Sequence, residues 1–287
     1  MNEQFDIWLK RVSELRNDKN VVLYGSGWLQ KQNVPQAYVS ITHEDLNGLM
    51  AVIKGMRFSD GLTLILHTPG GVTNATESLV DYLRAKFPAI EVIVPTYAMS
   101  AGTMISMAAD RIVMARHSQL GPIDPQMPMP GGRSYSARAI VDQFDQAKAE
   151  ITADPVVAHA WAPVLASLGP ALVKEASNNL EYSEKMVANW LEKYMLAGDS
   201  DAATRSAEIA HYFADNSHHK SHGRRIGRDE AQAQGLAIES LEDSQDCQEA
   251  VLTVYHLMTI WFEQTLATKI IWSSMGSSWL KNWGGAT

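Results

Sequence analysis

Twice in this chain an apolar, strand-like segment ends in a turn of small residues that leads into a helical pattern. Residues 62–66 run into His-Thr-Pro-Gly-Gly at 67–71, and residues 90–94 are followed by Ala-Met-Ser-Ala-Gly-Thr at 98–103. A strand followed by a helix is the repeating unit of folds in which helices cover a sheet. The two junctions therefore favour a layered α/β core.

The rest of the pattern continues this alternation. Strands are predicted at 21–24, 37–41, 62–67, 90–94 and 112–114, and helices at 43–56, 73–86 and 100–109. From residue 136 to residue 214 the pattern becomes almost wholly helical. We interpret that stretch as a helical elaboration of the α/β core.

The two turns contain what a nucleophile and an oxyanion hole require. A Gly-Gly pair at 70–71 lets backbone N–H groups face a cleft, because no Cβ stands in the way. Ser100 opens the second helical run, where free N–H donors and the positive end of the helix dipole lie nearby. Either turn alone could equally be an ordinary tight connection between a strand and a helix, with a serine as the N-cap. The occurrence of both turns in this order favours a functional site.

Four segments together carry a family resemblance. They are residues 67–71, residues 98–103, Met-Ala-Ala-Asp-Arg-Ile-Val-Met at 107–114, and Leu-Gly-Pro-Ile-Asp-Pro-Gln at 120–126. With these segments the chain resembles the serine dehydrogenase proteinase family. That family is a branch of the Clp protease and crotonase superfamily and is related more distantly to signal peptide peptidase A.

The resemblance implies a fold and a domain division. The implied fold is a Clp protease/crotonase-like spiral of ββα units with additional C-terminal helices. Residues 1–240 are expected to form the α/β domain, including the helical elaboration at 136–214. Residues 241–287 are expected to form a C-terminal helix and a tail rich in Trp, Gly and Ser.

The resemblance also implies an activity. It makes Ser100 the nucleophile of a serine peptidase and assigns the oxyanion hole to the backbone N–H groups of Gly70 and Ala101. The substrate would be a peptide or protein, cleaved through an acyl-enzyme without a cofactor. Superfamily members commonly form rings or smaller homo-oligomers, so a homo-oligomer is expected, and a regulatory partner is left open.

Two residues compete for the role of general base. Signal peptide peptidase relatives place a lysine downstream of the serine, where this chain has Lys148, and a buried lysine can lose its proton near neutral pH. The alternative is His222, which fits the family's motif and which Asp124 could orient as in other serine hydrolases. Lys148 equally suits a solvated helix lysine, and His222 equally suits an exposed basic loop.

The other histidines are interpreted more plainly. His67 is kept as a residue that could line the cleft, because it immediately precedes the glycine turn. His219 and His222 are spaced for one face of a helical turn, but no carboxylate or cysteine flanks them at a recognised ligand spacing. No metal site is therefore predicted.

Composition limits the remaining classes. The chain has 287 residues and one cysteine, so an internal disulfide is excluded. Its net charge of −8 disfavours nonspecific binding to nucleic acid. No apolar run reaches the roughly 20 residues that a membrane span needs, and the start of the chain does not resemble a signal sequence. The expected compartment is the cytoplasm.

Two other functions share the same implied fold. A crotonase-like enzyme would use the oxyanion hole on acyl-coenzyme A thioesters, although that branch usually has glycine where Ser100 stands. A catalytically silent assembly module would keep the shape without a working base. Reaction with a fluorophosphonate separates the peptidase from the silent module, and thioester turnover reveals the crotonase-like enzyme.

Overall fold

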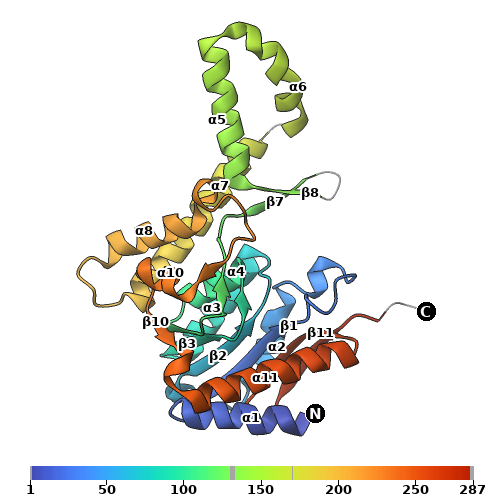
Figure 1. Ribbon diagram of the computed structural model, residues 1–287, viewed down its shortest axis with the longest axis vertical. Coiled ribbons are helices and arrows are strands. Elements are labelled where there is room, and N and C mark those ends of the chain that lie inside the picture. Colours follow the sequence, from blue (N-terminus) through green and yellow to red (C-terminus); the bar gives the residue numbers. More distant parts are fainter. Residues whose placement is uncertain (1, 130–132, 170, 285–287) are drawn as a thin grey trace.

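A central sheet with helices on both faces organises the chain in the computed structural model, which describes residues 2–129, 133–169 and 171–284 (Figure 1). The strands are β1 (Asn20–Ser26), β2 (Leu62–His67), β3 (Ile90–Val94), β4 (Tyr97–Ala98), β5 (Arg111–Met114), β6 (Gln119–Leu120), β7 (Gln126–Met129), β8 (Arg133–Ser136), β9 (Ile226–Gly227), β10 (Ile238–Ser240), β11 (Ala267–Ser273) and β12 (Ser278–Asn282). The helices are α1 (Asn2–Leu15), α2 (Glu44–Val52), α3 (Thr73–Lys86), α4 (Ala101–Met107), α5 (Ala137–Ala153), α6 (Ala158–Leu168), α7 (Leu172–Trp190), α8 (Ala202–Ala214), α9 (Asn216–His219), α10 (Arg228–Ala233) and α11 (Gln245–Gln264).

The main sheet has seven strands in the order β10-β5-β3-β2-β1-β11-β12. The first five are parallel to their neighbours, whereas β11 and β12 are antiparallel additions at the β1 side. A second sheet has the order β4-β6-β9, and β7 pairs with β8 as a hairpin. The layered α/β core predicted from the sequence is confirmed.

Alternating side chains of the parallel strands feed two separate cores. Leu64 and Leu66 of β2 join the cluster beneath α2, α3 and α4, while Ile65 joins the cluster under α1 and α11. Successive side chains of a strand point to opposite faces, so a run with apolar residues on both faces, such as 62–66, is buried on both of them. This is why the run reads as a strand between two layers of helices.

The predicted elements agree well in the parallel region. The strands predicted at 62–67 and 90–94 and the helix predicted at 73–86 coincide with β2, β3 and α3. The strand predicted at 37–41 is wrong. Residues Gln36–Tyr38 form a single 3₁₀ turn after Pro35, and Ile41 makes one isolated bridge, to Gly71.

The C-terminal segment is built into the main sheet. The helix expected after residue 240 is α11, and the Trp-rich tail that follows it forms β11 and β12. β11 pairs with β1 over five residue pairs, so this segment shares the sheet of the α/β domain. Residues 285–287 of the predicted tail lie outside the described residues.

The helical elaboration divides into two parts. α7 and α8 pack on the main core through residues that include Val187, Trp190 and Phe213. α5 and α6 instead extend away from the sheet, with the base of α5 packed on α7 (Figure 1). In the part of the chain that the structure describes, no helix is long and apolar enough to cross a membrane.

Candidate active site

Ser100 occupies a sharp turn between a strand and a helix. β4 ends at Ala98, α4 begins at Ala101, and Ser100 between them has φ 53° and ψ −116°. A positive φ is costly for any residue with a Cβ and persists where the surrounding structure imposes it. In serine hydrolases a strained turn of this kind presents the serine hydroxyl at the end of the sheet.

The glycine turn after β2 lies directly against Ser100. Gly70 has φ +104°, and a Cβ there would lie 2.7 Å from Ser100 Cβ and 3.0 Å from Ala101 N. The Thr68 N–H donates to the Tyr97 carbonyl at 3.0 Å, which pairs the two turns. The two junctions singled out in the sequence therefore meet in space, and Gly70 leaves no room for a side chain between them.

Three backbone N–H groups border this contact, and they differ in their partners. The Gly70 N–H donates to Thr68 Oγ1 at 3.1 Å. Among the described residues, the N–H groups of Gly71 and Ala101 meet no hydrogen-bond acceptor. The expectation named Gly70 and Ala101, but the geometry makes Gly71 the glycine with a free donor. The sequence signal that could have pointed to it is the adjacent second glycine.

The loop after β6 is held beside the same turn. Thr103 Oγ1 accepts a hydrogen bond from the Gly121 N–H at 2.9 Å and donates to the Ala98 carbonyl at 2.8 Å. A Cβ on Gly121 would lie 3.6 Å from the Ser100 N. Asp124 follows three residues later, so its Cα lies within about 11 Å of the Gly121 Cα.

Asp124 pairs with His222. His222 Nδ1 lies 2.7 Å from Asp124 Oδ1, and the Asp124 side chain is fully buried while that of His222 is 27% exposed. The other carboxylate oxygen, Oδ2, accepts from Gln126 Nε2 at 2.8 Å and from Asn216 Nδ2 at 3.2 Å. The carboxylate thus has one oxygen for the imidazole and one oriented by two amides. Gln126 and Asn216 had no distinguishing pattern in the sequence, since only the fold brings them to Asp124.

Lys148 lies in a different setting. It is on α5, the helix that extends away from the sheet (Figure 1). Its side chain is exposed. Within the described residues its ammonium group contacts neither Ser100 nor a carboxylate. The structure therefore brings Gly70, Ser100 and Ala101 together and pairs Asp124 with His222, but it does not bring Lys148 to either group.

His67 is buried beneath the glycine turn. Its ring packs against Trp28, Tyr97 and Tyr255, its Nδ1 lies 2.9 Å from Thr96 Oγ1, and Nε2 has no partner in the described structure. Burial lowers the pKa of His67 to about 3, so the imidazole is neutral at physiological pH. The His67 ring lies on the face of the sheet that α11 covers and packs there behind the glycine turn.

Replacing His67 with glutamine is expected to flatten the pH dependence of stability. In the unfolded chain this imidazole takes up a proton near pH 6.5, whereas in the folded protein it does so only near its pKa of about 3. The folded state therefore loses stability as pH falls from 6.5 towards 3, by about 2 kcal/mol between pH 7 and pH 5. Urea unfolding at the two pH values measures this difference. His43→Gln, at an exposed histidine, is the control, and equal slopes for His67→Gln and wild type would contradict the prediction.

His219, which was considered with His222 as a metal ligand, has other hydrogen-bond partners. Its Nε2 lies 2.7 Å from the Tyr212 carbonyl, and its Nδ1 lies 3.0 Å from an Arg224 nitrogen. Among the described residues, no group of three or more His, Cys, Asp or Glu side chains is placed to hold a metal ion.

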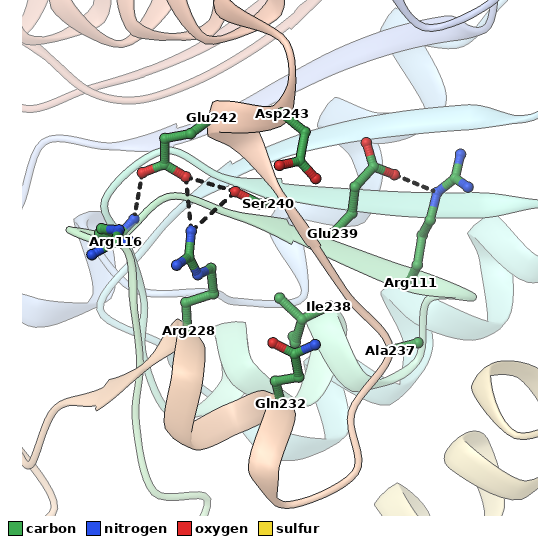
Figure 2. A pocket seen from close by; sticks show the side chains of 10 residues that line it. All are labelled: Arg111, Arg116, Arg228, Gln232, Ala237, Ile238, Glu239, Ser240, Glu242 and Asp243. Carbon is green, nitrogen blue, oxygen red and sulfur yellow. Dashed lines mark hydrogen bonds and ion pairs between the residues drawn. The ribbon is translucent and has the colours of Figure 1, made fainter.

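A pocket of about 740 Å³ lies away from these residues, lined by side chains of β5, α10 and β10 and of the segments beside them (Figure 2). Its charged side chains pair with one another: Arg228 contacts Glu242 at 2.9 Å, and Arg111 contacts Glu239 at 3.4 Å. None of the predicted site residues lines it. Volume alone therefore does not identify the chemical site of this protein.

The segment that contains the Ser100 turn is similar to known proteins. Residues 21–161 match the family described as ClpP-like SDH-type serine proteinase. Two uncharacterized proteins of Methanocaldococcus jannaschii are similar: one is 32% identical over 174 residues, covering 59% of this chain and 57% of the relative. The other is 36% identical over 107 residues, covering 37% and 35%. The chain thus spans little more than half of the first relative's length.

Solved structures of the 1510-N membrane-bound stomatin-specific protease are also similar. One aligns with a TM-score of 0.41 and 16% identity over 69% of this chain and 74% of the other. Another, in complex with a substrate peptide, has a TM-score of 0.42 and 18% identity over 69% and 70%. The serine turn, the glycine turn and the parallel strands β2, β3 and β5 all lie inside residues 21–161, the segment in which this chain is similar to the ClpP-like SDH-type serine proteinases.

Proposed function

We propose that this protein is a serine peptidase in which Ser100 is the nucleophile, His222 the general base and Asp124 the residue that orients His222. The observation that carries the proposal is the strained turn at Ser100, held against the glycine turn with two free backbone N–H groups beside it. A positive φ at a serine with no capping hydrogen bond costs stability, and such strain clusters at active sites.

The Asp124–His222 pair provides a base for the serine proton in this proposal. With Nδ1 held by a buried carboxylate, the imidazole keeps Nε2 free to accept a proton. Within the described residues, neither Ser100 Oγ nor His222 Nε2 has another hydrogen-bond partner. Catalytic hydrogen bonds are often longer before substrate binds, and the proposed mechanism requires His222 Nε2 to reach Ser100 Oγ in the complex with substrate.

The proposed reaction is peptide hydrolysis in two steps. Ser100 Oγ attacks the peptide carbonyl carbon while His222 takes the hydroxyl proton, and the carbonyl oxygen gains negative charge. The N–H groups of Ala101 and Gly71 would stabilise that oxyanion, each contributing on the order of a hundredfold in rate or more. His222 returns the proton to the leaving amine, and water then hydrolyses the acyl-enzyme with His222 again as base.

Fluorophosphonate labelling tests this assignment. The folded protein is expected to form one covalent adduct, which tandem mass spectrometry should map to Ser100, because the reagent reacts with activated serines. Ser100→Ala should not label while keeping its fold by circular dichroism. Wild-type protein that is folded but unlabelled would contradict the proposal and favour a silent assembly module, whereas an adduct at another serine would overturn the nucleophile assignment.

A further inference from the structure

A buried ion pair connects the C-terminal strands to the region of the glycine turn. Lys269 on β11 and Asp45 in the first turn of α2 are both fully buried, and Lys269 Nζ lies 2.5 Å from Asp45 Oδ1. The second oxygen, Oδ2, accepts from the Tyr24 hydroxyl at 2.9 Å. Two charges withdrawn from water are tolerated only when paired and fully hydrogen-bonded, so this arrangement has few alternatives.

The remaining hydrogen bonds of this pair hold the backbone on both sides of Ile41. Lys269 Nζ donates to the Ser40 carbonyl at 2.9 Å. Asp45 Oδ2 accepts the Thr42 N–H at 2.8 Å. The short segment 40–42 is therefore fixed by side chains rather than by a continuous ladder of strand hydrogen bonds, because Ile41 makes one isolated bridge.

Ile41 in turn holds the glycine turn. Its N–H donates to the Gly70 carbonyl at 2.8 Å, and its own carbonyl accepts the Val72 N–H at 3.0 Å. Gly71 lies between these two bonds, and a Cβ there would come within 2.3 Å of the Ile41 carbonyl oxygen. The position of the Ile41 backbone thus sets the direction of the free Gly71 N–H.

We propose that Lys269 and Asp45 are positioning residues of the oxyanion hole, acting through Ile41 on Gly70 and Gly71. This inference rests on the proposed function of Ser100. Neither side chain touches the reacting atoms, and Lys269 lies outside the segment that matches the protease family. The C-terminal strands therefore contribute to the site although they lie far from it in sequence.

The double variant Lys269→Met/Asp45→Asn tests the proposal. Lys269→Met alone would leave a buried carboxylate unpaired and could unfold the protein, whereas the second change removes that charge and keeps an acceptor for the Thr42 N–H. The Ser40 carbonyl still loses its donor. The control is Arg16→Met, which removes a cation from the ion pair with the buried Glu91 under the opposite face of the sheet.

Two readouts distinguish positioning from general destabilisation. The rate of fluorophosphonate labelling at Ser100 is expected to fall about 100-fold in the double variant, since displacement of an oxyanion donor costs about that much. Hydrogen exchange should become faster at the Ile41 and Val72 amides, while the exchange rates of the β2 and β3 amides should stay unchanged. Arg16→Met should leave the labelling rate and both amides as in wild type.

Each outcome either supports or overturns the positioning role of Lys269 and Asp45. Wild-type labelling together with wild-type exchange at Ile41 and Val72 in the double variant would overturn the proposal, and so would equal effects of Arg16→Met. If wild-type protein does not label at all, the assignment of Ser100 fails instead. Exchange at the two amides then still shows whether the buried pair positions the glycine turn.

Discussion

Replacing His222 with alanine is expected to slow labelling and peptide hydrolysis by roughly 10⁴-fold or more, because the serine proton then has no acceptor. The imidazole is held by the buried Asp124 carboxylate, with Nδ1 2.7 Å from Oδ1. The second-order rate constant for fluorophosphonate labelling measures the loss without requiring a known substrate.

Lys148→Ala is the competing variant in the same assay. Its side chain is exposed on α5, so its removal is expected to leave the rate unchanged. His218→Ala controls for the loss of a nearby histidine, because His218 lies on α9, is exposed and contacts the Tyr212 ring rather than Asp124. A large loss in Lys148→Ala with a normal rate in His222→Ala would reverse the assignment of the base.

Replacing Asp124 with asparagine is expected to lower the rate by about 10⁴-fold while leaving the fold intact. Gln126 and Asn216 both donate to Oδ2, so the new side chain must place its carbonyl oxygen there and turn its NH₂ group towards His222. Nδ1 of the imidazole would then have to accept a hydrogen bond. That requires the proton on Nε2, the tautomer that cannot act as a base towards Ser100.

The matched control is Asp229→Asn, which removes a carboxylate that is 82% exposed. It should label at the wild-type rate. Thermal unfolding of both variants checks that the fold persists. If Asp124→Asn retains most of the wild-type rate, Asp124 has a structural role and His222 does not depend on it for its tautomer.

Local structure around the serine could be predicted because its causes are local. Mostly apolar runs at 62–66 and 90–94, each with one polar residue (Thr63 and Glu91), mark strands buried on both faces, and Gly70 marks a turn with a positive φ. The strand predicted at 37–41 shows the opposite case. Its apolar residues suit a strand, but Pro35 starts a 3₁₀ turn, and the backbone on either side of Ile41 is held by Lys269, which is distant in sequence, and by Asp45.

The sequence by itself determined the layered α/β fold, the resemblance to a protease family and the two turns whose chemistry suits a nucleophile and an oxyanion hole. It favoured Lys148 by position and kept His222 as the alternative, since spacing along the chain says nothing about contacts between distant segments. Tertiary structure alone placed His222 on Asp124, 98 positions away, left Lys148 in solvent and gave Gly71 the free donor. The reason is physical: a buried carboxylate and a constrained glycine acquire their partners only when separate elements pack together.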